Sequence, residues 1–289
     1  MSQVLPAQDG NRFGTFTGVF TPCVLTILGV IMFLRFDVVV GNAGVLSALG
    51  IVFASNAITI LTTLSLSAIA TNTKVEGGGV YFLISRSLGP KFGGAIGLLF
   101  FAAQALSVAL YVIGFTIALK QYLPEAVSPL LISTLTNVVV FGCVAIGAGW
   151  TLRIQFLILA TVAVSLCSFF VGAWSAFDPQ LLSSNLGSAY AGDESFWTMF
   201  ALFFPAVTGI MAGANMSGEL RDPGRSIPRG TLAAVFVTAL IYAAQAIFLG
   251  GSVSRHDLVH TEMVMSEVAI LPVFIAAGVV AATMSSALG

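Results

Sequence analysis

Charged residues divide this chain into eight uncharged stretches, each long enough to cross a lipid bilayer. A membrane-spanning helix needs about 20 consecutive, mostly apolar residues. The stretches cover residues 13–34, 38–73, 92–119, 126–152, 154–177, 195–218, 230–254 and 268–289. Only 8% of the residues are charged and 57% are hydrophobic, whereas a soluble domain carries roughly 25% charged residues. The sequence therefore predicts an all-α polytopic membrane protein, with a short tail over residues 1–12 and a transmembrane domain over residues 13–289.

The basic residues predict which side of the membrane each loop faces, because cytoplasmic loops are enriched in Lys and Arg. With the N-terminus inside, Arg35, Lys120 and Arg255 face outward, and the other eight of the 11 basic residues face the cytoplasm. These eight are Arg12, Lys74, Arg86, Lys91, Arg153, Arg221, Arg225 and Arg229. We therefore expect a cytoplasmic N-terminus in a plasma or inner membrane. The last stretch reaches Gly289 without a polar anchor, which indicates a fragment or a truncated chain.

Two of the stretches carry residues that interrupt a helix near their middle. The sixth contains Pro205, Thr208, Gly209 and Gly213, and the first contains Pro22 and Gly29. Proline removes a helix hydrogen-bond donor, and glycine weakens the helix around it. In hydrocarbon, broken helix persists only where it lines a protein cavity. Matching interruptions in two halves of a chain are typical of secondary transporters built from inverted repeats. We therefore expect both spans to be discontinuous and to form an ion-binding site.

Several polar residues in or beside the spans allow two interpretations. Arg35, near Asp37, either extends to the lipid headgroups or faces the transport path and pairs with an acid as an outer gate. The Tyr111 hydroxyl either bonds a neighbouring carbonyl or contacts a bound cation. Ser285 and Ser286 either pack helices or supply oxygen ligands to a small cation. The sequence alone leaves these alternatives open.

The sequence contains no nucleophilic triad, no zinc-protease motif and no dinucleotide fingerprint. It therefore does not indicate an enzyme, and we expect neither a cofactor nor a metal beyond transported alkali cations. No basic cluster suggests nucleic acid. The expected partners are the bilayer and small ions, and a homodimer is kept as a hypothesis because the sequence does not determine the oligomeric state.

Five segments of the chain resemble the cation–chloride cotransporters, a family within the amino acid–polyamine–organocation superfamily. The segment at 203–234, FFPAVTGIMAGANMSGELRDPGRSIPRGTLAA, is the most specific. The others are LGVIMFLR at 28–35, SLSAIATN at 65–72, GGGVYFLISRSLGPKFGGAIGL at 77–98 and LYVIGF at 110–115. The resemblance implies a LeuT-like inverted-repeat fold of about twelve helices. This chain would then hold a first repeat over about 13–177 and an incomplete second repeat over about 195–289.

The resemblance also implies three kinds of ion site. The implied chloride-binding residues are Gly29, Val30 and Ile31 for one ion and Gly209, Ile210 and Met211 for a second. The implied potassium-binding residues are Thr26, Ile27, Tyr111, Pro205 and Thr208. The implied sodium-binding residues are Leu25, Leu28, Ala282, Ser285 and Ser286. The family commonly has Asn where this chain has Thr26, which puts potassium binding in question.

These features together predict a secondary active transporter. The expected activity is electroneutral symport of sodium, and of potassium if Thr26 permits it, with chloride by alternating access. Two alternatives remain. One is an amino acid or amine permease of the same superfamily, because free amides also bind a carboxylate. The other is a membrane scaffold or fragment that does not transport.

Overall fold

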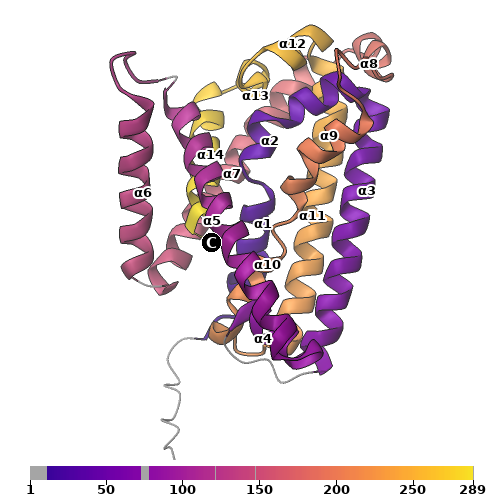
Figure 1. Ribbon diagram of the computed structural model, residues 1–289. Helices are drawn as coiled ribbons and strands as arrows, with labels where there is room; N and C mark the ends of the chain where they lie inside the picture. Colours follow the sequence, from indigo (N-terminus) through magenta and orange to yellow (C-terminus); the bar gives the residue numbers. More distant parts are fainter. Residues whose placement is uncertain (1–11, 73–77, 121, 147, 289) are drawn as a thin grey trace, which may run out of the picture.

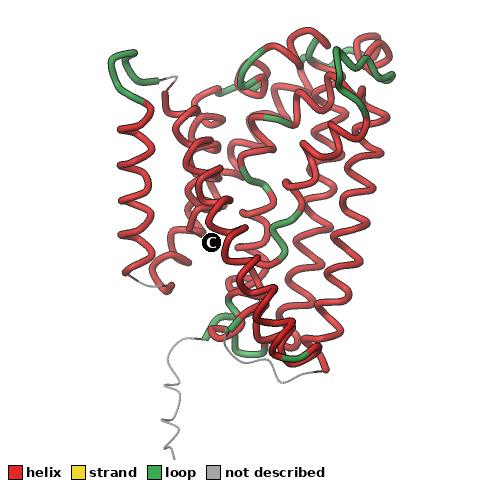
Figure 2. The backbone as a smooth tube through the Cα atoms, in the orientation of Figure 1, coloured by secondary structure: helices red, strands yellow, loops and turns green. Residues whose placement is uncertain are grey.

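The computed structural model describes residues 12–72, 78–120, 122–146 and 148–288. Residues 1–11 of the predicted tail, Lys74 and the side chain of Arg153 lie outside the described part. Helices and loops make up the described residues, as Figure 2 shows. The helices within the predicted spans are η1 (Phe16–Phe20), α1 (Thr21–Ile27), α2 (Val30–Leu34), α3 (Phe36–Asn72), α5 (Pro90–Lys120), α6 (Pro129–Ile146), α7 (Ala148–Ser175), α9 (Phe196–Phe203), η2 (Phe204–Val207), α10 (Met211–Asn215), α11 (Pro223–Ser252) and α14 (Pro272–Leu288). The connecting helices are α4 (Gly79–Leu88), α8 (Pro179–Asn185), η3 (Ser217–Glu219), α12 (Arg255–His260) and α13 (Val264–Val268).

Every predicted span coincides with apolar helix. Among the described residues, six helical segments are long and apolar enough to cross a membrane, and two shorter apolar helices, 129–145 and 272–287, occupy the other two stretches. The chain is therefore an integral, multi-pass membrane protein, and the all-α prediction is confirmed. Spans one and six are discontinuous, as predicted from their Pro and Gly residues.

The broken first span lies at the centre of the bundle. Helix α1 contacts α7, α10, α11 and α14, while α11 packs along α3, and α14 packs against α5 and α7 (Figure 1). Helix α6 stands at the edge of the bundle in Figure 1, and large apolar side chains such as Leu131 and Phe141 are exposed on it. Such surfaces suit contact with lipid, whereas the centre of the bundle can hold polar groups.

The second span differs from a single straight helix. Gly44 interrupts α3 with a positive φ, at φ 71° and ψ 161°, a conformation open essentially to glycine. A Cβ atom at this position would collide with the carbonyl of Gly187, so the close approach also favours glycine. The stretch at 38–73 exceeds the length of one span because α3 includes a kinked segment between Phe36 and Gly44.

The cytoplasmic end of the first span, in the predicted orientation, is tied to the loop after α10. The Phe13 amide donates to the Glu219 carbonyl at 2.8 Å, and the Arg221 amide donates to the Phe13 carbonyl at 3.0 Å. The Arg221 side chain donates to the carbonyl of Arg12 at 2.7 Å. These bonds connect the start of span one to the end of span six, which places the two broken helices next to each other.

Candidate ion-binding site

The first span breaks between Ile27, the last residue of α1, and Val30, the first residue of α2. Leu28 has φ −82° and ψ 50°, which is outside the helical range, and Gly29 is extended. The last carbonyls and first amides of a helix lack partners within that helix. The break therefore presents carbonyl oxygens from α1 and amide hydrogens from α2 within the helix bundle.

The sixth span breaks after a short 3₁₀ turn that contains Pro205. Thr208 donates its hydroxyl to the Pro205 carbonyl at 2.8 Å, and the next helical segment, α10, begins at Met211. The Thr59 hydroxyl donates to the Val207 carbonyl at 3.2 Å, which anchors this break to α3. Gly213, which the sequence placed in the interruption, lies inside α10 instead. A Cβ there would press on Val19, so Gly213 permits close packing against η1 rather than breaking the helix.

The two breaks are in direct contact. A Cβ atom at Gly209 would lie 2.8 Å from Cβ and Cγ2 of Thr26 and 3.0 Å from the amide nitrogen of Ile27. Any side chain at this position would therefore push the two broken spans apart. The glycine lets the backbone of span six approach Thr26 and Ile27 of span one closely.

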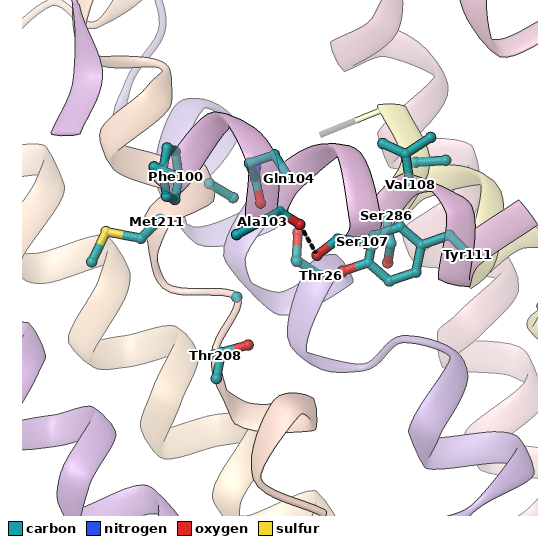
Figure 3. A pocket seen from close by; sticks show the side chains of 13 residues that line it. Thr26, Phe100, Ala103, Gln104, Ser107, Val108, Tyr111, Thr208, Met211 and Ser286 are labelled. Carbon is teal, nitrogen blue, oxygen red and sulfur yellow. Dashed lines mark hydrogen bonds between the residues drawn. The ribbon is translucent and has the colours of Figure 1, made fainter. Parts of the chain in front are cut away.

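Two cavities adjoin this contact, with α5 as their opposite wall. The larger has a volume of about 260 Å³ and the smaller about 60 Å³. Thr26, Ser107, Tyr111 and Thr208 line both. In Figure 3, Thr26, Ser107 and Tyr111 lie near one another, while Phe100 and Met211 line the other end of the larger cavity. Tyr111, Pro205 and Thr208 all line the smaller cavity, and the role of Tyr111 as a cation ligand stays a prediction.

The predicted site residues are distributed around these cavities. Those lining the smaller cavity are Thr26, Ile27, Gly29, Val30, Ile31, Tyr111, Pro205 and Thr208. Gly209, Met211 and Ser286 line the larger one. Five predicted site residues are buried and line neither cavity: Leu25, Leu28, Ala282, Ser285 and Ile210. The carbonyl of Ile210 accepts a weak hydrogen bond from Cys23 at 3.6 Å, so its backbone points partly into the protein.

Helix α5 contributes two polar residues that the sequence alone does not single out. Gln104 and Ser107 lie seven and four residues before Tyr111, on the same helical face, and both line the larger cavity. Ser107 donates its hydroxyl to the Ala103 carbonyl at 2.9 Å, which leaves its oxygen lone pairs available as acceptors. The spacing relative to Tyr111 is the only signal in the sequence, and it becomes specific only when α5 faces the breaks.

The two serines of α14 lie behind the first break. Ser286 Oγ is 3.5 Å from the carbonyl oxygen of Leu25. Ser285 is 2% exposed, and its hydroxyl has no hydrogen-bond partner among the described residues. A buried hydroxyl without a partner is costly, so this position favours an additional ligand.

A third cavity lies beside α2, on the side of the break that faces outward in the predicted orientation. It has a volume of about 180 Å³ and is lined by Val30, Ile31, Arg35, Glu262 and apolar residues of α5. The Arg35 side chain is exposed, whereas Asp37 is buried and accepts a hydrogen bond from the amide of Val38 at 2.8 Å. Arg35 lines the same cavity as Val30 and Ile31 at the start of α2, and its role as an outer gate stays a prediction.

Comparisons with known proteins agree with this arrangement. The family model described as "Amino acid permease" matches residues 18–289. The chain is 40% identical over 264 residues to solute carrier family 12 member 1 of Oryctolagus cuniculus and of Homo sapiens, which covers 84% of this chain and 24% of each relative. It is 40% identical over 263 residues to solute carrier family 12 member 2 of Squalus acanthias, covering 84% of this chain and 22% of that protein. The chain thus spans about a quarter of the length of these relatives.

Proposed function

This chain belongs to the amino acid permease family and, within it, to the cation–chloride cotransporters, and we propose that it forms the ion-binding part of a sodium-coupled chloride symporter. Potassium is the proposed second cation. The observation that carries the proposal is the meeting of two broken helices at shared cavities. Each break offers backbone amide donors and carbonyl acceptors that lack partners within their helix, and the hydroxyl-bearing residues Thr26, Ser107, Tyr111 and Thr208 line both cavities.

The cavities favour binding an anion and a cation together. The described residues that line the two inner cavities are all uncharged. A single ion in such a low-dielectric site loses its hydration without gaining a countercharge. Ions of opposite sign a few ångströms apart offset that cost, because their attraction is much stronger there than in water. This supports an electroneutral symport in which each ion improves the binding of the other.

The proposed potassium site lies beside the smaller cavity. Carbonyls of Thr26, Ile27 and Pro205 and hydroxyls of Tyr111 and Thr208 are the proposed ligands. The hydroxyl of Thr26 donates to the carbonyl of Pro22 at 2.8 Å. Its lone pairs remain free for a cation, so Thr26 offers an oxygen where the family commonly has an asparagine side chain.

The proposed sodium site lies between α1 and α14. Its ligands are the carbonyls of Leu25, Leu28 and Ala282 and the hydroxyls of Ser285 and Ser286. The partnerless Ser285 hydroxyl and the 3.5 Å distance from Ser286 Oγ to the Leu25 carbonyl support this assignment. For chloride, we propose the amides of Gly29, Val30 and Ile31 at one site and of Gly209, Ile210 and Met211 at a second. Helix N-termini suit anions.

Uptake of isotopic chloride into vesicles that contain the purified full-length protein tests the proposed function. We expect uptake that requires sodium, rises with potassium and does not respond to an imposed membrane potential. Stabilisation by amino acids without any chloride requirement would instead support the permease alternative, which the size of the 260 Å³ cavity favours. Vesicles that take up neither ion nor amino acid would support a non-transporting scaffold.

Replacing Tyr111 with phenylalanine removes one proposed potassium ligand without changing the ring. A hydrogen bond to a charged group contributes about 1.5–3 kcal/mol, and 1.4 kcal/mol corresponds to a factor of ten. We therefore expect Tyr111→Phe to raise the KM for rubidium, a potassium substitute, about tenfold. Tyr122→Phe is the matched control, because Tyr122 is exposed between α5 and α6. Equal KM values for rubidium in the two variants would mean that Tyr111 is not a potassium ligand.

The proposed orientation, with the N-terminus in the cytoplasm, can be tested at the two ends of α11. Arg225 lies in its first turn and His256 follows its end, so about 45 Å of helix separates the two sides. In a background lacking the three native cysteines, Arg225→Cys should resist an impermeant thiol reagent in intact cells, and His256→Cys should react. The reverse pattern would invert the topology.

A further inference from the structure

A buried tyrosine on α11 contacts the first break from the side opposite the cavities. Tyr242 is 0% exposed, and its hydroxyl donates to the carbonyl oxygen of Ile27 at 2.8 Å. Ile27 is the last residue of α1 and also lines the smaller cavity. The residue at the end of the broken helix therefore lies between the tyrosine and the proposed cation site.

Aromatic packing fixes the direction of this hydroxyl. The Tyr242 ring meets Phe36 of α3 edge to face at 5.2 Å between centroids, and meets Phe203 of α9 edge to face at 5.0 Å. Phe36 and Phe203 are themselves 5.0 Å apart. Edge-to-face contacts of this kind are specific in geometry. Helices α3 and α9 therefore hold the tyrosine in place while its hydroxyl points at α1.

We infer that Tyr242 is a positioning residue for cation binding, and this inference rests on the proposed function. A carbonyl oxygen has two lone pairs. The hydroxyl of Tyr242 occupies one of them and so holds the Ile27 carbonyl in one orientation, which leaves the second for a cation. Beyond Ile27 the chain leaves the helical conformation at Leu28, so the helix ladder does not itself fix this last carbonyl. The hydrogen bond from α11 replaces that missing constraint.

A second contact from α11 provides a natural comparison. Gln245, three residues after Tyr242, donates its side-chain amide to the carbonyl of Met32 at 2.9 Å. Gln245 is also 0% exposed. Like the Tyr242 bond, it joins a buried side chain of α11 to a backbone carbonyl of the first span. The Met32 carbonyl, however, lies within α2 after the break and is not a proposed ligand. Loss of either bond should reduce stability, but only loss of the Tyr242 bond should reduce cation affinity.

The test compares Tyr242→Phe with Gln245→Met in the full-length protein. Tyr242→Phe keeps the ring and removes the hydroxyl. We expect it to raise the KM for rubidium about three- to tenfold, the effect of losing one buried hydrogen bond. At saturating rubidium, the KM for chloride and the maximal rate per folded transporter should stay as in the wild type. Gln245→Met should lower Tm by a similar amount and leave the rubidium KM as in the wild type. The potassium-induced rise in Tm should shrink in Tyr242→Phe alone.

Each other outcome overturns a specific statement. An unchanged rubidium KM in Tyr242→Phe, or an equal rise in both variants, would mean that the hydroxyl only stabilises the fold. If Tyr111→Phe weakens rubidium binding while Tyr242→Phe does not, the positioning role fails and the proposed function stands. If the wild-type protein shows no cation-dependent chloride uptake, both the positioning role of Tyr242 and the proposed function are overturned. Should Tyr242→Phe not fold, Phe36→Leu keeps the hydroxyl but loosens its packing, and a rubidium KM equal to that of the wild type would overturn the inference.

Discussion

Replacing Ser285 and Ser286 together with alanine is expected to weaken sodium binding at least tenfold. Ser285 is buried and its hydroxyl has no hydrogen-bond partner in the described part of the chain, and Ser286 approaches the Leu25 carbonyl. Both hydroxyls are therefore placed to act as ligands. A hydrogen bond to a charged group contributes about 1.5–3 kcal/mol, and we take a similar free energy for each hydroxyl that contacts sodium. A tenfold change in affinity corresponds to about 1.4 kcal/mol, so losing either contact exceeds it. Sodium titration of the double variant, by uptake and by thermal shift, measures the effect.

The chloride response of the same variant separates loss of a ligand from loss of structure. The proposed chloride donors at Gly29, Val30 and Ile31 are backbone amides and survive the substitution. Since coupling between sites is reciprocal, chloride affinity should lose its enhancement by sodium and keep its sodium-free value. Ser55→Ala is the matched control, because Ser55 on α3 is also fully buried, its hydroxyl likewise has no hydrogen-bond partner among the described residues, and it lines neither cavity. Unchanged sodium dependence in the double variant would mean that the serines only pack helices.

Introducing alanine at Gly209 is expected to reduce transport more than tenfold. The added Cβ would lie 2.8 Å from two carbon atoms of Thr26 and 3.0 Å from the backbone nitrogen of Ile27. Neither group is the end of a flexible side chain, so the two breaks must separate. Overpacking of this kind typically costs about 1–3 kcal/mol. The displacement would move the amides of span six away from the oxygens of span one, and both cation and chloride KM should rise.

Gly50→Ala tests whether the effect belongs to this contact. Gly50 lies within α3, and a Cβ there has no heavy atom within 4 Å. Alanine favours helix by up to about 1 kcal/mol over glycine, so this variant should keep or raise Tm and retain uptake. Wild-type uptake by Gly209→Ala would contradict the close contact between the two breaks.

The sequence predicted the parts of this protein that depend on local chemistry. Uncharged stretches predicted all eight spans, because the bilayer penalises charge at any point along a helix. Pro205, Gly29 and Gly209 predicted the interruptions, because their effect on a helix acts within one turn. Gly213 was misplaced in the break for the same reason. Glycine also occurs where helices approach closely, and only the neighbouring Val19 reveals that role.

The sequence by itself therefore determined the membrane class, the spans and the position of both breaks. The tertiary structure alone decided which groups meet there. Tyr242 reaches a carbonyl 215 positions away, and Ser286 reaches one 261 positions away. Hydrogen-bond partners across such separations are set by how whole helices pack, and local periodicity carries no information about them. The same holds for Ser107, which becomes a cavity residue only because α5 faces the two breaks.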